Sequence, residues 1–79
     1  MDRNSQQKGR EVAIERPPIE LYQLLKLVNL AASGGEAKLS IAGGLVRVNG
    51  RVETRKRRKL VAGDLVEYAG EALRITAPA

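Results

Sequence analysis

The pair Asn49-Gly50 is the feature that most constrains how this chain folds. Both residue types tolerate a positive φ angle, so the pair is typical of a two-residue turn between antiparallel strands. Leu45 to Val48 precedes the pair and has the apolar, β-branched character of a strand. The chain is therefore predicted to reverse direction here and to build antiparallel sheet around the turn.

The residues that follow the turn conflict with the simplest register. A strict two-residue hairpin would place Val48 opposite Arg51 and Val46 opposite Glu53. That pairing sets charged side chains against apolar ones on the same face of the sheet. We therefore predict that the returning strand is offset or looped.

Two helices are predicted before the turn. The first runs from about Ile19 to Asn29, because Pro17-Pro18 suits a helix start and apolar residues then recur at a spacing of three and four. The second begins at Ser33, which forms a reciprocal capping box with Glu36, and it ends at Gly43-Gly44. The apolar positions of the first helix are Ile19, Leu21, Leu24, Leu25, Leu27 and Val28, and those of the second are Ala37, Leu39, Ile41 and Ala42. The predicted core combines Leu24, Leu25, Leu39, Ile41, Val46 and Val48.

Short strands complete the predicted fold. Residues 1–11 are polar and lack periodicity, so they are predicted to be a disordered leader, and residues 12–79 to form a single domain. Val12 to Arg16 could form a short edge strand. Further strands are expected at Leu60-Val61, Leu65 to Ala69 and Ala72 to Thr76, separated by turns at Gly63-Asp64 and Gly70-Glu71. The predicted fold class is α+β, with two short helices followed by a small, mostly antiparallel sheet.

The composition excludes several classes of chemistry. The chain has 79 residues and neither cysteine nor histidine, which excludes disulfides, thiol and histidine catalysis, and the usual zinc ligand sets. No apolar run approaches the roughly 18–20 residues of a membrane span. We predict a non-catalytic, soluble intracellular protein without cofactor, metal site, membrane partner or small-molecule substrate.

A concentration of positive charge follows the turn. The basic run, Arg55 to Lys59, combines with Arg47 and Arg51 to give seven basic residues against the single acid Glu53, and the formal net charge of the chain is +5. Charge of this density indicates an anionic partner, most often nucleic acid. On charge alone, a solvated loop or a nuclear-import signal remains an alternative. The two tyrosines are the only aromatic residues, which favours recognition of phosphates and shape over base stacking.

The start of the second helix is another candidate phosphate contact. Gly34 and Gly35 leave backbone N–H groups unobstructed at the positive end of the helix dipole, and Lys38 follows one turn later. For this segment taken alone, an ordinary cap by Ser33 and Glu36 is the favoured interpretation. Lys38 could equally be a mobile charge that contacts the anion or a solubilising lysine.

The order of these segments resembles the S-four-type RNA-binding domain, which is named after a ribosomal small-subunit protein and is also called the alpha-L motif. That family combines a leucine-rich helix, a serine-led helix with alanine and a basic residue, Gly-x-Val-x-Val-Asn-Gly, and Gly-Asp before a last apolar strand. The matching positions are Leu24 to Leu27, Ser33, Ala37, Lys38, Gly44 to Gly50, and Gly63-Asp64. The Ser-Gly start and the basic run are similar to the small stand-alone bacterial YbcJ-like group.

The resemblance implies a cytoplasmic RNA-binding protein, with ribosomal or transfer RNA as the ligand class. We predict a monomer that binds structured RNA through its sugar-phosphate backbone. The ribosome or its precursor is then a candidate partner. In the family an arginine commonly follows the serine of the second helix, whereas this chain has Gly34. The expected RNA-binding residues are Ser33, Lys38, Arg47, Asn49, Gly50, Arg51, Arg55, Lys56, Arg57, Arg58 and Lys59.

Two alternatives remain open. The basic face could dock an acidic protein partner, for example in ribosome assembly. The chain could also be an accessory piece of an RNA-modifying enzyme, since the family often sits beside synthetase or pseudouridine-synthase domains.

Overall fold

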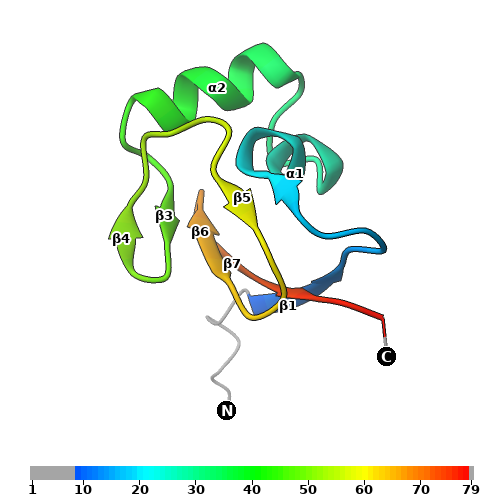
Figure 1. The fold of residues 1–79 in the computed structure, drawn as a ribbon. Helices are drawn as coiled ribbons and strands as arrows, with labels where there is room; N and C mark the ends of the chain where they lie inside the picture. The colour runs from blue at the N-terminus through cyan, green and yellow to red at the C-terminus, as the bar shows by residue number, and fades with distance from the viewer. Residues whose placement is uncertain (1–8, 79) are drawn as a thin grey trace.

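The computed structural model describes residues 9–78, which form two helices and seven strands (Figure 1). The helices are α1 (Leu21–Leu27) and α2 (Gly34–Ala42). The strands are β1 (Gly9–Ala13), β2 (Ile19–Glu20), β3 (Arg47–Val48), β4 (Arg51–Val52), β5 (Lys59–Leu60), β6 (Leu65–Tyr68) and β7 (Glu71–Thr76).

A five-stranded sheet organises these elements. Its strand order is β1-β7-β6-β3-β4, while β2 and β5 form a separate two-stranded ribbon. Every pair is antiparallel except β1 with β7, which is parallel. The helices α1 and α2 pack against each other. In Figure 1, α2 lies above the β3–β4 hairpin and β5. The predicted α+β class, with two short helices and a small, mostly antiparallel sheet, is confirmed.

Strand β1 begins inside the stretch that was predicted to be a disordered leader. Gly9 to Glu11 belong to β1, where they pair with Ala72 to Arg74 of β7. All of β1 except Val12 is exposed, so the sequence carries no apolar periodicity that would reveal the strand. The backbone pairing with β7 determines its conformation instead. The rest of that predicted leader, residues 1–8, lies outside the described residues.

The core includes side chains from both helices and from the inner face of the sheet. Leu24 and Leu25 of α1 and Ile41 of α2 are fully buried, as predicted. The prediction that Leu39 is a core residue is wrong, since 76% of it is exposed. Ala37 and Ile41 are four positions apart and share the buried helix face, so Leu39, midway between them, points to the opposite side.

Helix α1 is shorter than predicted because its first residues belong to a strand. Ile19 and Glu20 form β2, and they pair with Leu60 and Lys59 of β5. Glu20 has an extended backbone (φ −80°, ψ 147°) and caps the helix. After Leu27 the helix ends, and Asn29 adopts a φ of 63°, which a right-handed helix does not allow.

Helix α2 begins at the predicted cap, with one difference in the box. The Ser33 Oγ accepts a hydrogen bond from the backbone N–H of Glu36 (3.1 Å). The Glu36 carboxylate accepts from the N–H of Ala32 (2.7 Å) and not from that of Ser33. The predicted reciprocal box is therefore displaced by one residue, but the signal located the helix start correctly.

The Asn-Gly turn has the predicted conformation, but the register prediction was wrong. Asn49 and Gly50 have φ angles of 54° and 85°. The strict two-residue pairing is present, with Val48 opposite Arg51 and a hydrogen bond from the Glu53 N–H to the Val46 oxygen (2.9 Å). The pairing is tolerated because Arg51 lies on an exposed edge strand and because neighbouring arginines neutralise the Glu53 carboxylate.

The side chain of Asn49 joins two turns. Its amide nitrogen donates to the Asp64 carboxylate (3.0 Å), and its oxygen accepts from the Leu65 N–H (2.9 Å). The same carboxylate accepts from the N–H of Val61 (2.9 Å). The Asn-Gly and Gly-Asp motifs are therefore parts of one hydrogen-bonded unit, in which Asn49 holds β3 beside the start of β6.

Replacing Gly50 with alanine should lower the free energy of unfolding by about 1–2 kcal/mol, the cost of a left-handed conformation for a residue with a Cβ atom. No atom lies within 4 Å of the position that the Cβ would occupy, so the cost comes from the backbone angle and not from a clash. Urea unfolding followed by circular dichroism measures it.

Gly35→Ala is the matched control, since Gly35 lies in the first turn of α2 and is not among the glycines of positive φ. That substitution should leave stability unchanged or raise it. Equal destabilisation by both variants would refute the role assigned to the turn.

Candidate nucleic-acid interface

The basic run is held in a fixed path by the first turn of α1. The run connects the hairpin to β5, and the N–H of Leu21 donates to the Arg58 oxygen (2.8 Å). The next N–H, that of Tyr22, donates to the Lys56 oxygen (3.1 Å). These helix-terminal N–H groups have no partner within the helix, so the run supplies their acceptors. The backbone of the basic run is thus fixed to the folded domain.

A buried carboxylate organises two side chains of the run. Glu53 is only 8% exposed, and its oxygens accept from the Nε and Nη2 of Arg55 (2.9 and 3.1 Å). They also accept from the Nη1 of Arg58 (2.9 Å) and the backbone N–H of Arg55 (3.0 Å). Sequence reasoning treated Glu53 as a minor opposing charge. Arg55 and Arg58 follow Glu53 by two and five residues, so the sequence spacing could have indicated these ion pairs.

These contacts change the ionisation of the Glu53 carboxylate. The hydrogen bond from the Arg55 side chain is the largest cause, opposed by burial and reinforced by the Arg55 N–H and by Arg58, and it lowers the pKa of Glu53 to about 2. The same interaction raises the pKa of Arg55 above its ordinary value. Glu53 is therefore ionised at neutral pH and neutralises part of the positive charge of the run.

Two cations, Lys38 and Arg57, lie near the ring of Tyr22. The Nζ of Lys38 lies 4.6 Å from the centre of the Tyr22 ring, and the guanidinium carbon of Arg57 lies 5.7 Å from it. Arg57 also forms an ion pair with Glu20 (3.3 Å). Tyr22 also lies next to the start of α2: a Cβ atom built on Gly34 would be 3.7 Å from the Tyr22 ring. Sequence analysis did not select this tyrosine.

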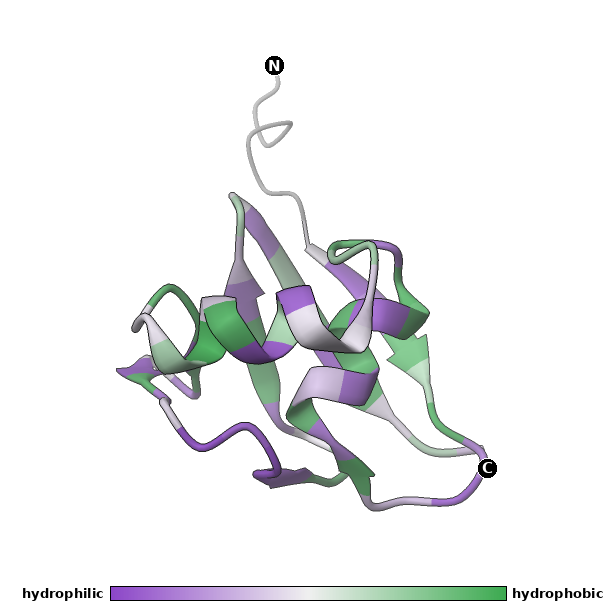
Figure 2. Cartoon of the chain, turned by 90° about the horizontal axis from the view of Figure 1, so that it is seen from above, coloured by the Kyte–Doolittle hydropathy of each residue, from purple (hydrophilic) through white to green (hydrophobic). Residues whose placement is uncertain are grey.

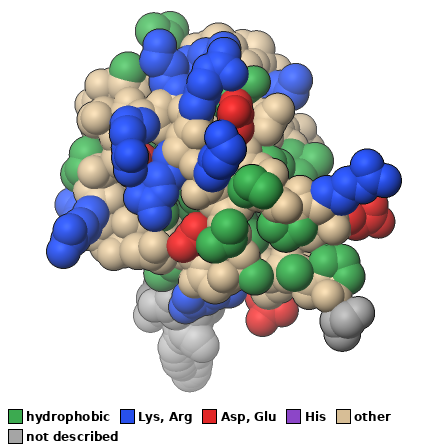
Figure 3. Space-filling model, viewed as in Figure 1, with side chains coloured by type: hydrophobic (Ala, Val, Ile, Leu, Met, Phe, Trp, Pro, Cys, Tyr) green, Lys and Arg blue, Asp and Glu red, His purple; other side chains and the backbone are tan. Residues whose placement is uncertain are grey.

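The other basic residues of the predicted site have no acidic partner within ion-pair distance among residues 9–78. They are Lys38, Arg47, Arg51, Lys56 and Lys59. Figure 3 shows lysine and arginine side chains gathered over the part of the molecule formed by α2, the hairpin and β5. In Figure 2 the basic run is a continuous hydrophilic stretch that leads into β5.

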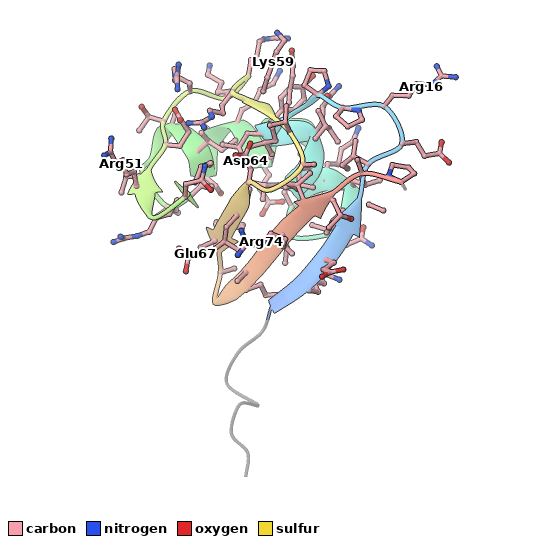
Figure 4. The ribbon with its side chains drawn as sticks, turned by 60° about the horizontal axis from the view of Figure 1, so that its bottom comes forward. Arg16, Arg51, Lys59, Asp64, Glu67 and Arg74 are labelled. Atoms are coloured by element: carbon pink, nitrogen blue, oxygen red, sulfur yellow. The ribbon has the colours of Figure 1, made fainter. Side chains whose placement is uncertain are left out.

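The structure separates Arg47 from this group. Successive side chains of a strand point to opposite faces, and Val48 points into the core, so Arg47 lies on the outer face of the sheet, opposite Glu67 in the register of β3 with β6. Arg51, opposite Val48, lies on the other side and lines a hollow of about 480 Å³ together with Arg55 and Arg58. Figure 4 shows Arg51 and Arg16 on opposite sides of the molecule.

The predicted site residues thus fall into three groups. Ser33, Asn49 and Gly50 cap a helix or form a turn, and the side chains of Ser33 and Asn49 already have partners inside the chain. Arg55 and Arg58 are held by the buried Glu53, whereas Arg57 pairs with Glu20 and lies near the Tyr22 ring, with 66% of its side chain exposed. Arg51, Lys56 and Lys59 are exposed, Lys38 is half-buried beside the Tyr22 ring, and Arg47 lies on the outer sheet face.

Comparison with protein families shows which family this sequence belongs to. The family model of the S4 domain matches residues 12–76, which is most of the chain. The chain belongs to the S4 domain family. The resemblance inferred from the Ser-led helix and the Asn-Gly and Gly-Asp motifs is therefore confirmed.

Relatives of this S4 domain lie in the YbcJ-like group. YbcJ of Escherichia coli (strain K12), whose name proposes RNA binding, is 49% identical over 63 residues, which cover 80% of this chain and 90% of YbcJ. RlbA of Bacillus subtilis (strain 168), whose name proposes a role in ribosome maturation, is 41% identical over 59 residues, covering 75% of this chain and 83% of RlbA.

A solved structure agrees with the fold of this S4 domain. The solution structure of Escherichia coli YbcJ, described as containing an alpha-L motif involved in RNA binding, matches with a TM-score of 0.66 and 43% identity. The match covers 98% of this chain and 96% of the other.

Residues 9–78 hold neither a candidate metal site nor a candidate membrane span. They contain no group of three or more acidic, histidine or cysteine side chains placed to hold a metal ion. None of the helices within the same residues has the length and apolar character to cross a membrane.

Proposed function

We propose that this S4 domain binds structured RNA through its sugar-phosphate backbone, and that it uses the face formed by the basic run, the hairpin and the start of α2. The observation that carries the proposal is the fixed path of the basic run, which α1 holds by two backbone hydrogen bonds. Rigid presentation of Lys56 and Lys59 reduces the ordering cost of binding a phosphate backbone.

The available side chains favour phosphate contacts over base contacts. Lysine and arginine are the main side chains of this face. The ring of Tyr22, next to it, has Lys38 and Arg57 nearby. The other tyrosine, Tyr68, is partly buried, and its hydroxyl forms a hydrogen bond with the hydroxyl of Ser40 (2.8 Å). Neither ring is free as a stacking platform, so we propose recognition of RNA shape with little base readout.

Ribosomal RNA is the ligand that we propose first. The name of RlbA points to ribosome maturation, and the name of YbcJ to RNA binding without a stated target. Family membership supports a binding role, and we propose no reaction for this chain. We propose that the protein acts as a monomer in the cytoplasm, with the ribosome or its precursor as partner.

Salt dependence tests the proposal. If about four to six phosphates are neutralised, the logarithm of the affinity for a ribosomal RNA hairpin should fall with the logarithm of salt concentration with a slope of roughly −3 to −5. The double substitution Arg51→Gln, Lys59→Gln should flatten the slope by about 1.5, because each lost phosphate contact removes about 0.7–0.9. Fluorescence anisotropy at several salt concentrations measures both slopes.

The charge-matched control is Arg16→Gln with Lys26→Gln, which also removes one arginine and one lysine. In Figure 4, Arg16 lies on the side away from Arg51. Lys26 is exposed and lies in the last turn of α1. The control should change the slope by less than about half a unit. Equal effects of the two variants would mean that binding depends on net charge alone, and the proposed face would be abandoned.

A protein adaptor with a basic docking face is the second candidate function. Exposed apolar side chains favour it, since Leu39 and Leu45 are 76% and 63% exposed. Pull-downs with and without nuclease treatment separate the two functions. Partners that persist after complete RNA digestion would favour the adaptor, and partners lost with the RNA would favour RNA binding.

A further inference from the structure

Three segments that are distant in the sequence meet at the Tyr22 ring. Tyr22 belongs to α1, Lys38 to α2 and Arg57 to the basic run. The Lys38 ammonium lies 4.6 Å and the Arg57 guanidinium 5.7 Å from the ring centre, and both distances are within the range of cation–π attraction. The ring is partly buried against the core, so its own position is fixed.

Two like charges near one ring would repel each other without compensation. The negative faces of the ring attract both cations, and Glu20 adds an ion pair of 3.3 Å to Arg57. The Tyr22 N–H also donates a hydrogen bond to the backbone oxygen of Lys56, one residue before Arg57. Backbone and ring therefore act together to hold this corner of the basic run against the start of α2.

The arrangement lowers the cost of binding an anion. A free lysine or arginine side chain loses rotamer entropy when it is immobilised. Against the ring, part of that loss occurs on folding and not on binding, which raises affinity. The ammonium group of Lys38 keeps N–H donors that do not face the ring and can reach phosphate oxygens.

We propose that Tyr22 is a positioning residue of the interface, whose ring holds Lys38 and Arg57 as one cationic pair that contacts RNA phosphates. The inference rests on the proposed RNA-binding function. It assigns to Tyr22 a role through its neighbours, and not the stacking of a base.

A double-mutant cycle in RNA affinity tests this role. Tyr22→Leu should weaken binding of a ribosomal RNA hairpin by about three- to tenfold, whereas Tyr22→Phe, which keeps the aromatic ring, should stay within about twofold. Lys38→Met should weaken binding in the wild type and clearly less in the Tyr22→Leu background. Lys26→Met is the matched control, because Lys26 is exposed on α1 and is not one of the cations at the ring, and its effect should be the same in both backgrounds.

A spectroscopic readout separates positioning from general stability. In the free protein, the methylene protons of Lys38 nearest the ammonium group should be shifted upfield by the ring current of Tyr22. The shift should persist in Tyr22→Phe. If Tyr22→Leu fails to fold, the wild-type spectrum still decides, because an unshifted Lys38 would overturn the inference.

The outcomes distinguish this inference from the proposed function. A wild type that binds no RNA would overturn the proposed function, and the inference with it. Intact RNA binding with additive effects of Tyr22→Leu and Lys38→Met would overturn the inference alone. Coupled effects that Tyr22→Phe does not disturb would support it.

Discussion

Replacing Leu25 with alanine should lower the free energy of unfolding by about 2–5 kcal/mol, the range for a leucine removed from a packed core. Leu25 is fully buried, and its backbone oxygen accepts hydrogen bonds from Leu30 and Ala31 just beyond α1. A domain of this length has roughly 4–12 kcal/mol of stability in total, so the variant should be close to unfolding at growth temperature. Urea unfolding monitored by circular dichroism measures the loss.

The same helix provides the control. Leu27→Ala makes the same chemical change at a position that is 58% exposed, and it should cost less than about 0.5 kcal/mol. Leu39→Ala, at 76% exposure, should behave similarly. If Leu25→Ala were as mild as Leu27→Ala, the packing of α1 against the core would be wrong.

Replacing Glu53 with glutamine should cost roughly 2–3 kcal/mol at neutral pH, because the buried carboxylate is the common acceptor for Arg55 and Arg58. The pKa of Glu53 is lowered to about 2 in the folded state. A group with a depressed folded pKa stabilises the protein above its unfolded pKa of about 4.3 and loses that contribution as the pH falls toward the folded value. The difference in unfolding free energy between wild type and variant should therefore shrink by more than half between pH 5 and pH 3.

The control for this prediction is Glu67→Gln, which neutralises an exposed carboxylate on the outer sheet face (Figure 4). It should change stability by less than about 0.5 kcal/mol. Urea unfolding of the three proteins from pH 3 to pH 7 provides the measurement. A stability difference for Glu53→Gln that is constant over this range would mean that the carboxylate does not titrate as the structure indicates.

The Glu53 contacts also change how the basic run must be tested. From the sequence, a triple substitution of Arg55, Arg57 and Arg58 would be expected to leave the melting temperature nearly unchanged, as in a solvated loop. In the structure all three arginines form ion pairs with glutamates, and two of them neutralise a buried carboxylate. Removing them would confound loss of stability with loss of RNA affinity. Arg51 and Lys59 avoid this problem.

Local chemistry determined the parts of this protein that the sequence predicted correctly. The hydroxyl of Ser33 caps α2 through an N–H three residues away, and Asn49-Gly50 adopts its turn because of its own allowed φ angles. Such interactions span a few residues, so the residues that form them are near one another in the sequence and can be recognised there. The same holds for the ordered motifs that identify the S4 domain, and for the excess of positive charge after the turn.

Only the tertiary structure decided which side chains are exposed and which cations are available. Leu39 is exposed because α2 turns the face of Ala37 and Ile41 to the core, and the sequence does not state which face finds a partner. Tyr22 meets Lys38 and Arg57 only because α1, α2 and the basic run converge in space. The sequence determined the charge of this surface. Packing between distant segments, with the burial and ion pairing that it imposes, decided which of those charges face solvent without an acidic partner.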